Sequence, residues 1–520
     1  MNTTMKRVSH RAAALILAAL TCTTAHAGIV YDSTNFATSG APGYGVGGTS
    51  STDLNGVYGD LLYPTGTGVL DSFKFAVFCS ASSTGNLTSA TETIRFYKGT
   101  DGSFIGGFSV TLGSLSKGYY SIYTVTGISS LNISLPYDAN GIRVTQQLSN
   151  VVGASRMGTL FSNASNTPRV GTTNAGLYMS NSSLSAGYYT FTPYHSYSSG
   201  VYQASLLQNL EWNSTSGTWN NSSVNWRDSG MPSPQGSTKF TNGDSVAFNN
   251  TSGGTVTLSG SLAPSSVNVS AASGTYTLVS SAGNQITGSA ALSKSGGGTL
   301  ILAGATTYSG ATTVTGGTLL VNGNLTNSAV TVGNGGTLGG SGTIGSLVTV
   351  LSGGTLAPGS SVGALTVGSV DLQAGSTTLM EIIGSGTGAG LAGTDYDQLV
   401  VTTAGGLGYG GTLNLAFGNA GAFANGTAFD LFSFSGNSSR HFASMVSSGS
   451  GLYSGLSFTG ANGVWTSTAG GQNLTFSEST GRLTFSAAAA SVPEPSSLIL
   501  SGLGVFGMLW IRGRRGARGG

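Results

Sequence analysis

A short step of glycine, threonine and an apolar residue recurs through the middle of this 520-residue chain. Successive steps are separated by 20, 24, 19, 19 and 18 residues and begin at Gly254, Gly274, Gly298, Gly317, Gly336 and Gly354. A repeat of about 20 residues is typical of a solenoid, because a unit of that size cannot bury its own apolar face and stacked units bury a shared one. We therefore predict an all-β fold whose central region, 209–370, is a parallel β-helix with one repeat per coil.

Equal spacing also predicts the register of the coils. Leu300, Leu319 and Leu338 each follow a Gly-Thr step and lie 19 residues apart. Coils of equal length place equivalent residues in neighbouring strands, about 4.8 Å apart. We therefore expect Leu319 to point into the core and to contact Leu300 and Leu338.

The chain uses charge sparingly. Charged residues make up 7% of it, where about 25% is usual for a soluble domain. A charge in a stacked row would repeat against its neighbour, so a β-helix tolerates few of them. Residues 296–369 contain no Asp, Glu, Lys, Arg or His, so general acid–base catalysis on these coils has no candidate group. Between Gly28 and Ser491 the chain has 12 basic and 16 acidic residues, a net charge of −4, which predicts no nucleic-acid partner.

Motifs of catalysis and metal binding are missing from the sequence. His195 and His441 are the two histidines after residue 27, and neither lies at metal-ligand spacing from another ligand type. No nucleophile elbow or phosphate-binding loop occurs. Asp395 and Asp397 could supply oxygen ligands to calcium, although a turn with solvated carboxylates is the more economical interpretation. We predict no catalytic residue, no metal site and no cofactor, and hence a protein that is not an enzyme.

The N-terminus has the order of a secretory signal peptide. A basic start is followed by an apolar run and then by Ala25 and Ala27, the small residues of an A-x-A cleavage site. We predict that residues 1–27 are removed before Gly28. The mature chain then keeps one cysteine, Cys79, which forms no internal disulfide and which we expect to be a small buried residue.

The C-terminus has the features of a second targeting segment. The uncharged residues 497–511 would span about 22 Å as a helix, which is short of the hydrocarbon core of about 30 Å. Together with residues 492–496 and the stems of the arginines that follow, the segment is marginally long enough to hold in a membrane. A Val-Pro-Glu-Pro sequence precedes this segment and arginines follow it: Val492, Pro493, Glu494, Pro495, Arg512, Arg514, Arg515 and Arg518. The arginines would keep the end of the chain in the cytoplasm and everything before the helix outside.

This order of features resembles the PEP-CTERM sorting signal of Gram-negative bacteria, and residues 492–520 carry the resemblance. The resemblance implies an exosortase-type membrane protease as partner. That protease would cut near the Pro-Glu-Pro and leave the protein at the cell surface or outside the cell, while the helix would anchor the chain in the membrane before processing. A permanent membrane anchor is the alternative, and it would give the same topology.

The repeats resemble a second known family. Residues 293–323 are similar to the autotransporter-associated β-strand repeat, which implies a passenger-like β-helix. Upstream, Trp212, Trp219 and Trp226 lie at intervals of seven residues. We interpret them as a cap on the open end of the β-helix, because solenoids require end caps. The alternative is a platform on which the three rings stack against sugars.

The regions on either side of the repeats also have the composition of strands. Residues 28–208 contain alternating aromatic and polar residues with Gly or Ser turns, which predicts an antiparallel β-sandwich. This region resembles the choice-of-anchor domains that accompany such sorting tails. Residues 371–491 predict a C-terminal β region, built either of further coils or of a closing sandwich.

The two targeting segments, the solenoid and the lack of catalytic groups favour an exported, non-catalytic structural or adhesive protein of the cell surface or extracellular matrix. A carbohydrate-binding surface protein is the second hypothesis, with exopolysaccharide as its partner. Its stacking rings would be the three tryptophans or aromatic residues of the first region such as Tyr119, Tyr120 and Tyr123. A polysaccharide-active enzyme ranks third, because the repeats offer no acid or base.

Overall fold

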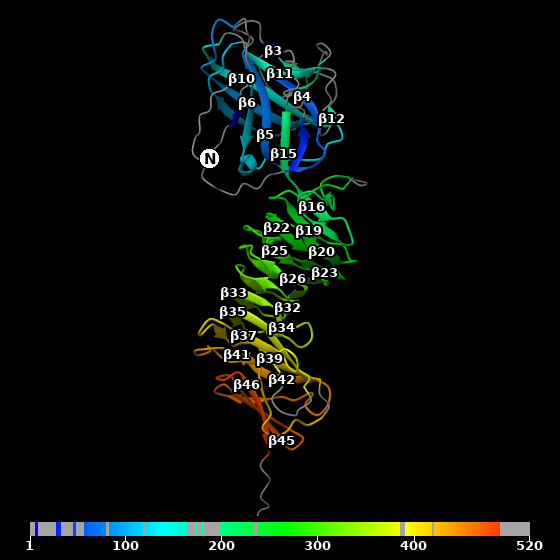
Figure 1. The fold of residues 1–520 in the computed structure, drawn as a ribbon, viewed down its shortest axis with the longest axis vertical. Helices are drawn as coiled ribbons and strands as arrows, with labels where there is room; N and C mark the ends of the chain where they lie inside the picture. The colour runs from blue at the N-terminus through cyan, green and yellow to red at the C-terminus, as the bar shows by residue number, and fades with distance from the viewer. Residues whose placement is uncertain are drawn as a thin grey trace, which may run out of the picture.

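The computed structural model describes residues 6–8, 28–32, 45–47, 57–79, 83–117, 120–154, 157–163, 172–173, 178–180, 197–200, 202–232, 237–384, 391–418 and 421–488. Within these ranges the chain consists of β-strands and turns, and the single helical element is the short 3-10 turn η2 (Ile128–Leu131). Figure 1 shows an elongated molecule with the N-terminal strands at one end, a stack of strands in the middle, and β45 and β46 at the other end. The all-β prediction is confirmed.

Two antiparallel sheets form the N-terminal end. The described strands of the first sheet are β1 (Lys6–Val8), β2 (Gly28–Asp32), β3 (Gly45–Gly47), β5 (Gly68–Cys79), β8 (Tyr120–Thr126), β9 (Ser134–Leu135), β11 (Met157–Asn163), β14 (Tyr197–Gly200) and β15 (Tyr202–Leu207). Those of the second are β4 (Val57–Tyr63), β6 (Ser89–Lys98), β7 (Phe104–Leu112), β10 (Ile142–Val152), β12 (Thr172–Thr173) and β13 (Tyr178–Ser180). Strand β1 falls within the predicted signal peptide and pairs with β8 in the full-length chain.

The two sheets enclose one hydrophobic core. Alternate residues of β6 and β10 are buried, as the two-residue period of a strand requires. Phe73 of β5 packs edge-to-face on Phe96 of β6, with ring centroids 5.3 Å apart, so the sheets form the expected sandwich. Cys79 is buried and unbridged, as the sequence predicts.

Two long parallel sheets form the solenoid. One contains β16 (Asn209–Trp212), β18 (Trp226–Asp228), β19 (Ser245–Phe248), β22 (Ser266–Val269), β25 (Ala291–Lys294), β27 (Ala305–Thr306), β28 (Thr312–Val314), β30 (Asn324–Leu325), β31 (Val330–Val332), β33 (Thr343–Val350), β35 (Ala364–Leu372), β37 (Gln398–Val401), β38 (Leu407–Gly408) and β41 (Phe432–Ser433). The other contains β17 (Gly217–Trp219), β20 (Gly254–Leu258), β23 (Thr275–Val279), β26 (Thr299–Ala303), β29 (Gly317–Val321), β32 (Gly336–Gly340), β34 (Thr355–Pro358), β36 (Thr377–Ile382), β39 (Thr412–Phe417) and β42 (Ser444–Gly449). Within this stack β21 (Ser261–Leu262) and β24 (Gln285–Ile286) form a separate two-stranded parallel sheet. Among the described strands of the two long sheets, β18 alone runs antiparallel to its neighbour, β16, at the N-terminal edge.

The register of the coils follows the Gly-Thr steps. Leu319 of β29 lies opposite Leu300 of β26 and Leu338 of β32, and all three side chains are fully buried. The predicted contact row is therefore confirmed. Gly317 opens β29 with a φ of 63°, and a Cβ there would lie 2.3 Å from the carbonyl oxygen of Gly298, so this corner requires glycine.

The coils continue beyond residue 370. Thr355, Thr377, Thr412 and Ser444 occupy equivalent positions in β34, β36, β39 and β42, which gives spacings of 22, 35 and 32 residues. An antiparallel sheet then closes the C-terminal end, made of β40 (Ala428–Asp430), β43 (Thr459–Ala461), β44 (Val464–Ala469), β45 (Gln472–Ser477) and β46 (Arg482–Ala487). The C-terminal β region thus combines further coils with a closing sheet.

The predicted membrane helix, 497–511, lies outside the described residues. Among the residues that the structure does describe, no helix is long and apolar enough to cross a membrane.

Candidate functional site

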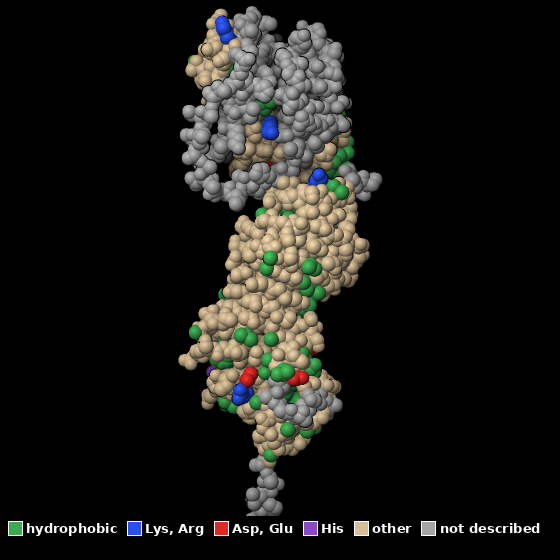
Figure 2. Space-filling view, in the orientation of Figure 1, with side chains coloured by type: hydrophobic (Ala, Val, Ile, Leu, Met, Phe, Trp, Pro, Cys, Tyr) green, Lys and Arg blue, Asp and Glu red, His purple; other side chains and the backbone are tan. Residues whose placement is uncertain are grey.

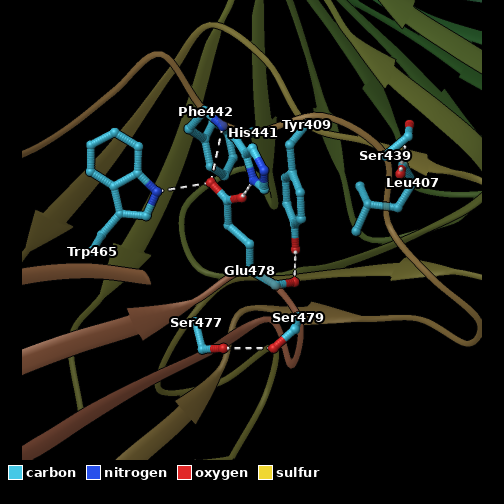
Figure 3. A network of polar contacts seen from close by, with 9 residues as sticks. All are labelled: Leu407, Tyr409, Ser439, His441, Phe442, Trp465, Ser477, Glu478 and Ser479. Atoms are coloured by element: carbon cyan, nitrogen blue, oxygen red, sulfur yellow. Dashed lines mark hydrogen bonds and ion pairs between the residues drawn. The ribbon is translucent and has the colours of Figure 1, made fainter. Parts of the chain in front are cut away.

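A buried glutamate lies at the C-terminal end of the solenoid (Figure 3). The side chain of Glu478 is 2% exposed. Its Oε1 accepts hydrogen bonds from the backbone N–H of Phe442 at 3.0 Å and from the indole N–H of Trp465 at 2.8 Å. Its Oε2 lies 2.5 Å from Nδ1 of His441. These three contacts replace the water that the carboxylate loses on burial.

The partners of Glu478 come from different segments of the chain. Glu478 lies between β45 and β46, Trp465 lies on β44, and His441 and Phe442 precede β42. Tyr409, which follows β38, donates its hydroxyl to the backbone oxygen of Glu478 at 3.1 Å. Burial, together with the nearby Glu478 carboxylate, raises the pKa of Tyr409. The network therefore fastens the closing sheet to the last coils.

An imidazole oriented by a buried carboxylate is the arrangement used in many proton-transfer and metal sites. The His441 side chain is 64% exposed, but no described group of three or more His, Cys, Asp or Glu residues could hold a metal ion. The nearby hydroxyls of Ser477 and Ser479 bond to each other at 2.9 Å, and in Figure 3 they lie on the other side of Glu478 from His441.

A second buried acidic cluster lies where the sandwich meets the solenoid. Asp228 accepts hydrogen bonds from the backbone N–H of Thr67 at 2.6 Å, from its hydroxyl at 3.0 Å, and from the side-chain amide of Gln208 at 2.9 Å. Asp244 accepts the backbone N–H groups of Gln208 and Thr241, each at 2.8 Å. Burial raises the pKa of Asp244 to about 7, and the Asp228 carboxylate acts in the same direction, while the two backbone hydrogen bonds act against it. The cluster links the sandwich to the first coils.

The three predicted tryptophans meet in the first coil. Trp212 is 2% exposed, and Trp219 and Trp226 are fully buried. Trp226 packs edge-to-face on both others, with ring centroids 5.0 Å from Trp212 and 5.2 Å from Trp219. Phe240 and Phe248 pack against the same cluster. This position corrects the sugar-stacking alternative, because a sugar needs an exposed ring face and these three rings offer none.

The two aspartates considered for calcium bind backbone groups instead. Asp397 is buried and accepts the N–H groups of Gly363 at 2.8 Å and Glu381 at 2.7 Å. Burial raises the pKa of Asp397 to about 7. Asp395 accepts the N–H of Leu391 at 2.7 Å. Asp397 thus belongs to a buried turn, whereas the sequence suggested a solvated one.

The residues predicted for processing lie mostly outside the described part of the chain. Gly28 is the first residue of β2, and the others lie outside the described residues: Ala25, Ala27, Val492, Pro493, Glu494, Pro495, Arg512, Arg514, Arg515 and Arg518. Sequence reasoning missed the Glu478 network and the Asp228–Asp244 cluster, because their partners are far apart in the chain. The available signal was the rarity of acidic residues, which makes each one conspicuous.

Two short segments of the chain match the models of known families. Residues 292–321, which run from β25 to the end of β29, match the passenger-associated-transport-repeat family. Residues 491–515 match the PEP-CTERM protein-sorting motif. The chain therefore carries a signal for export and exosortase-dependent sorting, with a membrane-anchored stage before processing, which is consistent with a place at the cell surface. No curated protein matches the chain.

Proposed function

We propose that this protein is a non-catalytic structural or adhesive protein of the cell surface or extracellular matrix, in which the solenoid is a spacer. The observation that carries the proposal is the placement of the two ends. The sandwich lies at one end of the molecule, and β46, after which the sorting tail follows, lies at the other (Figure 1). A chain held by its tail would therefore display the sandwich away from the membrane.

The solenoid has the properties of a spacer. One of its sheets has ten strands, so its nine steps of about 4.8 Å give a length of about 43 Å. Each step is secured by parallel backbone pairing with the next coil. The face in Figure 2 shows no Lys, Arg, Asp or Glu in the middle of the stack, and residues 296–369 contain none. These features support a scaffold rather than a catalytic surface.

An exosortase-deficient strain of the native host tests the sorting step and the spacer together. In that strain the full chain should stay in the membrane fraction with residues 492–520 intact, and the sandwich should be accessible to protease added to spheroplasts. In the parent strain the tail should be absent, as read by mass spectrometry. An intact C-terminus in the parent strain would favour the permanent anchor.

Turnover assays test the non-catalytic part of the proposal. The purified chain should release no reducing ends or unsaturated products from acidic or neutral polysaccharides during prolonged incubation. Product formation that scales with protein concentration would overturn the proposal and favour the enzyme hypothesis.

A deletion strain tests the adhesive role. Deletion of the chain should reduce cell attachment. The full chain should restore attachment, and the chain without residues 28–208 should not.

A further inference from the structure

A β-bulge places two aromatic rings side by side on the outer face of the sandwich. Strands β6 and β7 pair from Ala90 opposite Leu112 to Phe96 opposite Gly106, and the register then shifts so that Tyr97 lies opposite Phe104. Bulges of this kind commonly re-aim a side chain next to a functional site.

The bulge leaves an aromatic pair at the surface. The rings of Tyr97 and Phe104 have centroids 5.5 Å apart and planes inclined by 58°. Phe104 is 61% exposed, while Ile105, the extra residue of the bulge, packs against the core of the sandwich. A single exposed apolar residue needs no explanation, but an aromatic pair built by a backbone irregularity is a feature of a binding surface.

Two guanidinium groups lie beside the aromatic pair. Arg143 of β10 lies opposite Tyr97, and Arg95 precedes Tyr97 by two residues and so shares its face. Nη1 of Arg95 donates to the side-chain oxygen of Gln147 at 3.1 Å, and Nη2 of Arg143 donates to the carbonyl oxygen of Gly99 at 2.9 Å. Among the described residues no carboxylate lies within ion-pair distance of Arg95.

The edge strand leaves Arg95 uncovered on one side. Gly107 of β7 lies opposite Arg95, and a Cβ at Gly107 would lie 3.1 Å from the Arg95 stem and 2.5 Å from the carbonyl oxygen of Ile94. Glycine is therefore required here, and its missing side chain leaves the arginine open towards the edge of the sheet.

Glu92 of β6 is buried on the inner face, and the acidic residues described near the outer face lie at its end. Asp138 accepts hydrogen bonds from Thr100 and Asn140, and Asp101 accepts one from the N–H of Ser103. These bonds tie both carboxylates to the turns at the end of β6. The row that runs from Tyr97 through Arg95 to Thr93, away from these turns, carries aromatic, cationic and hydroxyl groups.

We propose that this outer face of the sandwich binds a polysaccharide that contains uronic acids. The ring faces of Phe104 and Tyr97 contact the apolar faces of sugar rings, and Arg95 pairs with a uronate carboxylate, for which the planar guanidinium is suited. Arg143 flanks the same sugar. The site goes beyond the spacer role and does not depend on it.

The test is a titration of the processed chain, purified from the parent strain, with polygalacturonate and with dextran, a neutral polymer. We expect saturable binding of polygalacturonate that weakens as salt rises, because the pairing is ionic, and at least ten-fold weaker binding of dextran. Phe104→Ala and Arg95→Gln should each lower the affinity for polygalacturonate by about ten-fold or more, a change of about 1.4 kcal/mol.

Matched variants control for general effects. Thr111→Ala changes an exposed residue of the same strand β7, and Lys117→Gln removes an exposed cation beyond the far end of that strand, so both should bind as the parent chain does. Arg95→Lys keeps the charge and should recover part of the affinity if Arg95→Gln folds poorly. The proposal is overturned if the parent chain does not bind polygalacturonate, if Phe104→Ala and Arg95→Gln bind unchanged, or if dextran binds equally well.

Discussion

The two ends of the solenoid are closed in opposite ways. At the N-terminal end Trp212, Trp219 and Trp226 fill the first coil, and none of their indole N–H groups has a hydrogen-bond partner. At the C-terminal end the half-buried Trp465 donates its N–H to the buried Glu478. The same type of side chain serves as an apolar plug at one end and as part of a polar clamp at the other.

The apolar plug and the polar clamp differ because the two ends of the solenoid adjoin different structures. The plug continues the apolar interior of the coils, so ring packing, worth about 0.5–1.5 kcal/mol for each aromatic pair, offsets the buried N–H groups. The clamp joins parallel coils to an antiparallel sheet. Glu478 accepts hydrogen bonds from the backbone N–H of Phe442 and the indole N–H of Trp465 and contacts His441. It therefore links the segment before β42 to the pair β44 and β45, which the backbone ladder already joins to each other.

The largest effect should come from the coils between the two ends. Leu319→Asp places a carboxylate in a buried row of leucines, and an unpaired buried charge costs several kcal/mol. Because each coil contacts only its neighbours, limited proteolysis should open residues 300–340 while both ends stay folded. Thr318→Asp, one residue earlier on the outer face, is the control and should remain resistant. Equal resistance of Leu319→Asp would mean that the two ends alone hold the stack.

The next effect should distinguish the plug from the clamp. Trp219→Ala removes a fully buried ring and should lower the free energy of unfolding by about 3–5 kcal/mol. Trp465→Ala removes a half-buried ring and should cost less. Denaturant unfolding, with proteolysis of residues 209–250 as a local readout, measures both. The distinction fails if the two variants are destabilised equally.

Loss of the carboxylate should weaken the clamp. Glu478→Ala leaves the N–H groups of Phe442 and Trp465 without their acceptor and should cost about 2–4 kcal/mol. Glu478→Gln keeps one oxygen as an acceptor and should cost less. Hydrogen exchange at the Phe442 amide should accelerate in the alanine variant, and unchanged exchange there would show that the clamp is not held by Glu478.

Measured over one pH unit, the smallest effect should be a pH dependence of the N-terminal end. The pKa of Asp244 is about 7 in the folded chain against an ordinary value of 3.8, so the folded state binds this proton more tightly than the unfolded state does. The contribution of Asp244 to stability should therefore be greatest below about pH 4 and should fall as pH rises towards 7, by at most about 1.4 kcal/mol for each pH unit.

Proteolysis at two places in the chain distinguishes the titration of Asp244 from that of Asp397, which lies in the later coils. Asp244→Asn should flatten the pH dependence of proteolysis at residues 209–250. Asp397→Asn should leave that dependence in place and flatten the one near residues 380–400, because the pKa of Asp397 is also raised to about 7. A flat profile in the parent chain would contradict both assignments.

The sequence predicted the coils well wherever their length was constant. Leu300, Leu319 and Leu338 could be aligned because equal spacing fixes the register, and the structure pairs them as expected. Beyond residue 370 the strands still stack, but loops of different length separate Thr377, Thr412 and Ser444. Periodicity cannot detect coils whose connections vary, although the backbone pairing is the same.

The sites were less predictable than the fold. The sorting motif is local, so its residues could be read directly, and the comparison confirms the motif over residues 491–515. The aromatic residues suggested for sugar binding included Tyr123, which is buried. The sequence analysis did not identify Phe104, because its exposure depends on the bulge at Ile105 and no sequence pattern predicts a bulge.

The regular register of the central coils also has a genetic consequence. One coil of 19 residues corresponds to 57 nucleotides, so an in-frame duplication or loss of that length restores every Thr-on-Thr and Leu-on-Leu pairing at its boundaries. Such a change alters the height of the rod by about 4.8 Å and leaves the plug and the clamp untouched. Related lineages could therefore adjust the reach of this protein by unequal recombination, without mutating either end.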